Sequence, residues 1–230
     1  MTSKALGFRD VLLRPHTPTR LNSRSEANTH THIGRIPLAI PVIVPSMRSL
    51  VTPDLINNVE GVGGLVVQPR GTFIASRRIA INSSLVTALE VAKQITSITQ
   101  DGILSLEIAN GHMVRMGDTL KYIRDRFGQA VSIWAGTVAT PEGVEYLAQS
   151  GADTAIVGIG VGAVCTTTKK TGVGYPVLQT ILDCADCSIP IISAGGIREA
   201  GDFVKAIAAG ADGVMIGRLL AGCSDTYDVH

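Results

Sequence analysis

Eight short runs rich in Ile, Val, Leu and Ala recur along the chain, and this repetition limits the possible fold more than any other feature. Each run is long enough for one β-strand, and most are followed by a loop and a segment with helical periodicity. Strands that alternate with helices form parallel sheets. Eight such units favour a closed (β/α)8 barrel, the TIM-barrel architecture, over an open α/β sheet. The runs span residues 39–45, 63–68, 77–82, 103–110, 131–136, 153–160, 190–196 and 212–217.

The composition supports strands that are buried on both faces. Hydrophobic residues make up 45% of the 230 residues, whereas aromatic residues make up only 4%. The core must therefore be mainly aliphatic, as in parallel sheets covered by helices. A formal net charge of +1 argues against nucleic acid as the main partner. No apolar run approaches the roughly 20 residues of a membrane span, so we expect no membrane partner.

Two connections depart from the strand–helix alternation. Only residues 69–76 separate the second and third runs, which is too short for a crossover helix. Thirteen residues follow Gly217, too few for a full closing helix. We therefore expect one domain: a minimal barrel over 37–230, preceded by a polar N-terminal arm or cap over 1–36. The predicted helices lie within 85–99, 115–127, 140–151, 175–186 and 198–210.

The cysteines give the cellular context. Four cysteines without a framework spacing indicate reduced thiols, and the first ten residues lack the apolar core of a signal peptide. We therefore expect a cytoplasmic protein. Cys184 and Cys187 form a Cys-x-x-Cys pair inside a predicted helix, and we interpret them as packing residues. Cys165 differs, because it lies in a loop between glycines.

The strand ends are where a barrel of this type carries its chemistry. The last two runs end in glycines, namely Gly195, Gly196 and Gly217. Their N–H groups would suit a phosphate at the usual phosphate corner of barrels. Tight strand–helix turns are the alternative explanation of these glycines.

The loop GIGVGAVCTTTKKTGVGYP, residues 158–176, resembles the active-site loop of the inosine monophosphate dehydrogenase and guanosine monophosphate reductase family, whose pattern is close to GxGPGSxCTT. The run TKKTGVGYP and the following DCAD favour the reductase branch, as do DVLLRP and SRSE near the N-terminus. EIANGH is similar to the reductase's DVANGY, and WAGTVAT to its AGNV segment. The resemblance extends from about residue 8 to residue 222.

This resemblance implies covalent chemistry on a purine nucleotide. Cys165 would attack C2 as a thiolate, the 2-amino group would leave as ammonia, and hydride from NADPH would arrive at C2. Thr167, beside Thr166, would help to protonate the leaving amine or to activate water. The family also binds a monovalent cation such as K⁺ through backbone carbonyls, here those of Gly158, Gly160 and Cys165. Family members form tetramers, so we expect a homotetramer.

The remaining site residues are expected from the resemblance and from their positions at the strand ends. His112, which follows the Asn110–Gly111 turn, is either a further cofactor or base contact or an exposed loop histidine. The expected cofactor contacts are Glu107, Asn110, Gly111, Thr137 and Gly158. The expected substrate contacts are Met47, Arg48, Gly162, Ala163, Ala194, Gly195, Gly196, Gly217 and Arg218.

The sequence departs from the family pattern mainly within this site. Ala163 replaces a phosphate-binding serine, and Ala194 replaces the aspartate that binds the ribose hydroxyls. Arg48 and Arg218 could take over the phosphate, because a guanidinium forms paired hydrogen bonds with it. The lost aspartate fits a deoxy or otherwise ribose-modified nucleotide. The other departures are Val161 for a proline, Gln68 for the reductase's lysine, Thr137 for an asparagine, and the absence of the family's flap and C-terminal segment.

Three interpretations remain open at this point. The first is a GMP reductase-like oxidoreductase. The second is a nucleotide-binding or regulatory homologue that has lost catalysis. The third is a barrel enzyme with different chemistry at the same thiol, such as deamination without hydride transfer.

Overall fold

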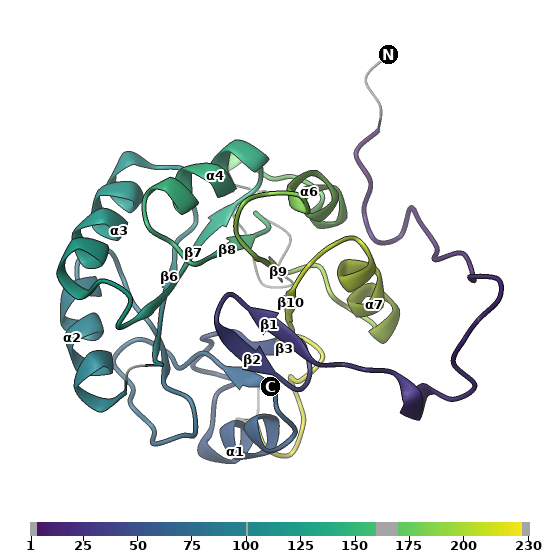
Figure 1. Cartoon of the computed structure of the whole chain (residues 1–230), viewed down its shortest axis with the longest axis horizontal. Helices are drawn as coiled ribbons and strands as arrows, with labels where there is room; N and C mark the ends of the chain where they lie inside the picture. The colour runs from purple at the N-terminus through teal and green to yellow at the C-terminus, as the bar shows by residue number, and fades with distance from the viewer. Residues whose placement is uncertain (1–3, 100, 160–169, 227–230) are drawn as a thin grey trace.

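The computed structural model describes residues 4–99, 101–159 and 170–226. Its centre is a sheet of eight parallel strands in the order β4-β3-β10-β9-β8-β7-β6-β5. Helices lie around the outside of this sheet (Figure 1). Each predicted run contains one strand, and β7 continues two residues beyond its predicted end. The strands are β3 (Val42–Val44), β4 (Leu65–Val66), β5 (Ala80–Asn82), β6 (Ile103–Glu107), β7 (Ser132–Val138), β8 (Thr154–Val157), β9 (Ile191–Ala194) and β10 (Gly213–Met215).

Gln68 closes this sheet into a barrel by joining its two outermost strands, β4 and β5. Its N–H donates to the carbonyl oxygen of Ala80 (2.8 Å), and its own carbonyl accepts from the N–H of Asn82 (2.9 Å). The fully buried side chain donates to the Ile74 carbonyl and accepts from the Ile74 N–H, both at 2.8 Å. One residue therefore closes the barrel and holds the connection 69–79. The predicted (β/α)8 architecture is confirmed.

Among the described residues, five α-helices lie where the periodicity predicted them, and one further α-helix was missed. The missed helix is α1 (Pro53–Gly61), whose Asn57 and Asn58 lower its helix propensity. Its start nevertheless carries a recognisable signal, because Thr52 caps it and Pro53 occupies its first turn. The predicted helices are α2 (Ala88–Ile98), α3 (Val114–Phe127), α4 (Pro141–Gln149), α6 (Val177–Cys184) and α7 (Ala200–Ala208).

The two irregular connections are as predicted. Within the described residues, neither 69–79 nor 218–226 forms a helix. The C-terminal segment instead lies against α1. There, the Thr52 hydroxyl donates to the Asp225 carbonyl, and Asn58 Nδ2 donates to Asp225 Oδ2 at 3.1 Å.

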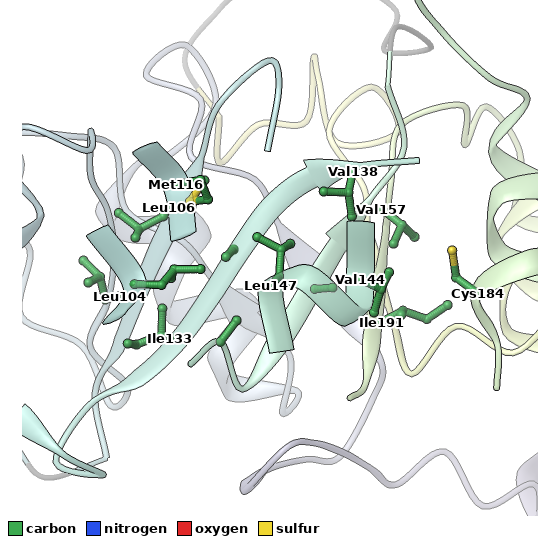
Figure 2. Packing of buried hydrophobic residues seen from close by; sticks show 14 of the residues in the cluster. Leu104, Leu106, Met116, Ile133, Val138, Val144, Leu147, Val157, Cys184 and Ile191 are labelled. Atoms are coloured by element: carbon green, nitrogen blue, oxygen red, sulfur yellow. The ribbon is translucent and has the colours of Figure 1, made fainter. Parts of the chain in front are cut away.

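The apolar side chains form layers inside and outside the barrel. Ile103 belongs to the interior cluster, whereas Leu104 and Leu106 pack outward against the helices (Figure 2). Successive residues of a strand point to opposite faces. Ser105 and Glu107 of β6 therefore point into the barrel. Glu107 is the last residue of its strand, so its carboxyl lies at the end where barrels carry chemistry.

A β-hairpin plugs the opposite end of the barrel. It consists of β1 (Thr31–Ile33) and β2 (Ile36–Leu38), and its buried side chains join the interior cluster with Trp134. The Thr31 hydroxyl donates to the carbonyl of Asp212, just before β10 begins, at 3.1 Å. The hairpin spans residue 36, where we placed the boundary between arm and barrel; that boundary stays a prediction.

The N-terminal segment lies against α6 and α7 before the arm extends away from the barrel (Figure 1). The Gln179 N–H donates to the Leu6 carbonyl at 3.0 Å, and Lys205 Nζ donates to the Phe8 carbonyl at 2.8 Å. No helix among the described residues has the length and hydropathy to cross a membrane.

We predict that Gln68→Leu lowers the free energy of unfolding by about 2–4 kcal/mol. Leucine fills a similar volume but leaves the Ile74 N–H and carbonyl without their side-chain partners. Gln94→Leu, at an exposed position of α2, is the matched control. Urea unfolding of both variants measures the difference, and equal losses would show that Gln68 does not hold the connection.

Candidate active site

Met47 and the glycines after the last two strands form one corner at the carboxyl ends of the strands. Ala194 ends β9, and Gly195 (φ +88°) and Gly196 (φ +79°) follow in a backbone conformation that favours glycine. A Cβ atom added to Gly217 would lie 3.3 Å from the sulfur of Met47. The structure therefore brings together these predicted substrate contacts, which come from β3, β9 and β10.

This glycine corner presents backbone donors. Within the described part of the chain, the N–H groups of Gly195, Gly196 and Gly217 donate to no protein acceptor. Gly158 follows β8 with φ +126°, and a side chain there would collide with the carbonyl of Ala194. Neighbouring backbone N–H groups without a protein acceptor suit an anion such as phosphate.

The two arginines that we expected to bind phosphate lie differently. Arg48 Nη2 donates to the carbonyl of Arg70 at 2.7 Å, so its side chain reaches toward β4 and away from β10. Arg218 is exposed and directly follows Gly217. Its side chain has neither a hydrogen bond nor an ion pair with any described residue. The phosphate role of both arginines stays a prediction, and only Arg218 adjoins the glycine corner.

Glu107 is the centre of a polar network on the other side of the barrel mouth. Its Oε1 accepts from the Ser105 hydroxyl (2.9 Å) and from Asn82 Nδ2 (3.4 Å). Arg70 Nε donates to Asn82 Oδ1 (2.6 Å), and Arg70 Nη2 donates to the Glu107 carbonyl (3.2 Å). Burial raises the pKa of the Glu107 carboxyl, while the hydrogen bonds from Ser105 and Asn82 and the charge of Arg70 oppose that rise.

Three members of this network were missed by sequence reasoning. The alternation of β5 and β6 could have placed Asn82 and Ser105 on the interior face beside Glu107. Arg70 carries no such signal, because it lies in an irregular connection. Gln68 stands where the reductase has a lysine, and its side chain is hydrogen bonded to that connection and not to the side chains of this network.

A cavity of about 640 Å³ lies over the ends of β6, β7 and β8. Asn110, His112, Thr140, Ile159 and Tyr175 are among its lining residues. Its size is that of a small-molecule pocket. Of the residues that we expected to contact the cofactor, Asn110 lines the cavity directly.

The turn beside this cavity explains the glycine at residue 111. The Gly111 N–H donates to the Thr137 carbonyl at 2.8 Å, and a Cβ atom on Gly111 would lie only 2.9 Å from the same oxygen. The Thr137 N–H in turn donates to the Ile108 carbonyl at 2.9 Å. Gly111 and Thr137 thus fix the turn that presents Asn110. Whether they also touch a cofactor stays a prediction.

His112 is held as a neutral imidazole in the wall of the cavity. Its Nε2 accepts from the Ala139 N–H at 3.2 Å, so the neutral ring carries its proton on Nδ1. The ring lies against Gly143 at the N-terminus of α4, where a Cβ atom would collide with it. Partial burial lowers the pKa of His112, and the nearby Glu142 carboxylate opposes this effect.

The predicted nucleophile and most of its loop lie outside the described residues. These positions are Gly160, Gly162, Ala163, Cys165, Thr166 and Thr167. Of the other cysteines, Cys184 is fully buried, and burial raises the pKa of its thiol to about 12. Burial also raises the pKa of Cys187. Both thiols are poor nucleophiles, as expected for packing residues.

Comparisons with known proteins agree with this architecture. The family sequence model described as "IMP dehydrogenase / GMP reductase domain" matches residues 72–227. A GMP reductase of Shewanella pealeana is 36% identical over 241 aligned residues, which cover 94% of this chain and 69% of that protein. A GMP reductase of Vibrio vulnificus is 36% identical with the same coverage.

Among solved structures, inosine 5′-monophosphate dehydrogenase from Legionella pneumophila is similar to this chain with a TM-score of 0.89 and 34% sequence identity. The match covers 97% of this chain and 72% of that protein. The sequence and structure matches confirm the family resemblance carried by the glycine-rich loop and the other segments quoted above.

We predict that Gly143→Ala displaces the His112 ring from α4 and raises the His112 pKa toward its ordinary value. The added methyl group would overlap the imidazole. Displacing the ring would break the bond from Ala139 that requires the neutral form. An NMR titration of the His112 Cε1–H resonance measures the change. Gly201→Ala in α7, where a Cβ atom meets no neighbour, is the control, and an unchanged titration in Gly143→Ala would contradict the contact.

Proposed function

The chain belongs to the IMP dehydrogenase/GMP reductase family, which places it among oxidoreductases of purine nucleotides, and we propose that it is a GMP reductase-like enzyme. In this proposal GMP, or a deoxy or ribose-modified form of it, is reduced with NADPH as the hydride donor. The observation that carries the proposal is the glycine corner with its available N–H groups, in a chain that is 36% identical to GMP reductases.

The corner supports the binding of a nucleotide phosphate. The backbone N–H groups of Gly195, Gly196 and Gly217 lie there without an acceptor among the described residues. Backbone N–H groups without a protein acceptor stabilise a negative charge. Ala194 presents a methyl group beside them, where a ribose hydroxyl would find no side-chain acceptor. This supports a sugar that lacks one hydroxyl.

The cavity over β6–β8 supports a nicotinamide cofactor. Its volume of about 640 Å³ and its apolar residues Ala109, Pro141 and Ile159 suit a flat ring. Asn110 and His112 add polar groups that could fix the orientation of the ring. Bound NADPH would supply the hydride. The residues that would hold it are Asn110, Gly111, Thr137 and Gly158, whereas Glu107 belongs to the separate network with Ser105, Asn82 and Arg70.

Cys165 is the proposed nucleophile. Its thiolate adds to purine C2, the C2–N bond breaks, and the amine takes a proton and leaves as ammonia. Hydride then replaces sulfur at C2, and the thiolate is released. Thr166 and Thr167 are proposed to assist the leaving amine, and the carbonyls of Gly158, Gly160 and Cys165 to hold K⁺. We also propose a homotetramer, which sedimentation velocity tests.

We predict that the wild-type protein oxidises NADPH in the presence of GMP and releases ammonia, and that Cys165→Ser lowers this rate by about a thousandfold or more. The decrease in absorbance at 340 nm measures NADPH oxidation, and an ammonia assay measures the released amine. Cys223→Ser, at an exposed thiol, is the control.

The alternatives give different outcomes. Ammonia release without NADPH oxidation would indicate deamination alone. Nucleotide binding without either product would indicate a binding or regulatory homologue. Full activity of Cys165→Ser would exclude the covalent mechanism.

We predict that Arg218→Ala weakens binding of the nucleotide about tenfold or more but leaves binding of the matching nucleoside nearly unchanged. A guanidinium–phosphate hydrogen bond contributes about 1.5–3 kcal/mol, more than the neutral hydroxyl bond that Ala163 has lost. Isothermal titration with both ligands measures the effect. Arg115→Ala, at an exposed position of α3, is the control. Equal losses for both ligands would place the phosphate elsewhere.

A further inference from the structure

The polar network around Glu107 joins four neighbouring strand ends. Arg48 follows β3, Arg70 follows β4, Asn82 ends β5 and Glu107 ends β6. Arg48 donates to the Arg70 carbonyl, and Arg70 donates to Asn82 and to the Glu107 carbonyl. Arg48 thus holds the backbone of Arg70, while Asn82 and Glu107 hold its guanidinium, although Arg70 lies in an irregular connection.

The network also fixes the orientation of the Asn82 amide. Its Nδ2 donates to Glu107 Oε1, and its Oδ1 accepts from Arg70 Nε. A reversed amide would place a donor against the arginine and an acceptor against the carboxylate. Arg70 thus turns the Asn82 NH2 group toward Glu107, where it donates to Oε1.

The two oxygens of Glu107 consequently differ. Oε1 accepts from both Ser105 and Asn82. Oε2 has no hydrogen bond to any described residue, and its residue points into the barrel at the end of β6. When the carboxyl is protonated, its proton therefore lies on Oε2. Oε2 is then free to donate to a bound ligand.

The strand order places this oxygen opposite the glycine corner. In the closed barrel the strands follow one another from β3 to β10, so β6 lies across the mouth from β10 and β5 lies across from β9. A nucleotide whose phosphate binds at Gly195, Gly196 and Gly217 and which extends across the mouth would direct its base toward β5 and β6.

We propose that Glu107 is the proton donor for the amine that leaves the purine, and that Arg70 is its positioning residue. This inference rests on the proposed function. When the C2–N bond breaks, its electron pair goes to nitrogen, which takes the proton from Oε2 and leaves as ammonia. Ser105, Asn82 and Arg70 then stabilise the carboxylate, which regains a proton from water.

The surroundings of the carboxyl agree with this role. Burial raises its pKa, so the acid form persists to higher pH than for an exposed glutamate. The groups that act on it are Ser105 on its own strand, Asn82 on β5 and Arg70 on the β4–β5 connection. Its partner in register on β7 is Gly136, which has no side chain. Arg70 is thus the charged group that acts on this carboxyl.

A substrate whose leaving group needs no proton separates an acid from a structural residue. GMP must release an amine, whereas 2-chloroinosine 5′-monophosphate releases chloride. Glu107→Gln should lower NADPH-dependent turnover of GMP by about a hundredfold or more. Turnover of the chloro nucleotide should stay within about threefold of wild type, because its departure does not use the acid. Glu90→Gln, at an exposed position of α2, is the control for both substrates.

The pH profile tests the role of Arg70. GMP turnover should fall as pH rises through the Glu107 pKa, because only the acid form donates. Arg70→Ala removes the nearby positive charge, raises that pKa and should move this fall to higher pH, with a lower kcat and little change in KM. Arg70→Lys keeps the charge and should restore the wild-type position of the fall.

The outcomes separate this inference from the function on which it rests. Equal losses of both substrates in Glu107→Gln, or no loss with GMP, would overturn the inference and leave the reductase function intact. An unshifted profile in Arg70→Ala would overturn the role of Arg70. If the wild-type protein turns over neither nucleotide, the proposed function fails, and the inference fails with it.

Discussion

The pairing of Gln68 with β5 is the interaction on which the rest of the barrel depends. β4 is only two residues long, so Gln68 provides the backbone hydrogen bonds that turn an eight-stranded sheet into a closed ring. Its side chain also occupies the outer layer, where a crossover helix would otherwise pack, and satisfies both backbone groups of Ile74. A buried amide can replace a helix here because it has both a donor and an acceptor to offer a short connection.

That closure determines what the mouth of the barrel contains. Because Gln68 directs its side chain into the outer layer, it cannot contribute to the mouth, and Arg70, two residues later, supplies the positive charge there. The connection 69–79 is also short enough to hold Arg70 over β5 and β6, where Asn82 and Glu107 receive it. A longer, helical crossover would carry the chain away from the mouth after only a few residues. Gln68 and the short connection after it therefore close the barrel and organise one half of the candidate site.

The sequence predicted the strands, five helices and the glycine corner, because each depends on a local pattern. Buried strands require apolar runs, and positive-φ turns such as those at Gly195 and Gly196 require glycine. α1 was missed because its asparagines lower its helix propensity and its main signal is the Thr52 cap. The network of Arg70, Asn82 and Glu107 was not predictable as a unit. Its members are distant in sequence, and only the strand order and the irregular connection bring them together.

The distribution of charge and hydrogen-bond donors across the mouth favours one orientation of a bound nucleotide. The corner at β9 and β10 offers backbone N–H groups and the exposed Arg218, so it favours a phosphate. The opposite side carries a carboxyl whose pKa is raised by burial, and its protonated form suits a neutral base with hydrogen-bonding edges. Arg48 belongs to the same side as Glu107, because it donates to the Arg70 carbonyl and its side chain is directed away from the phosphate corner. A nucleotide bound in reverse would place its phosphate near Glu107, away from the backbone N–H groups of Gly195, Gly196 and Gly217.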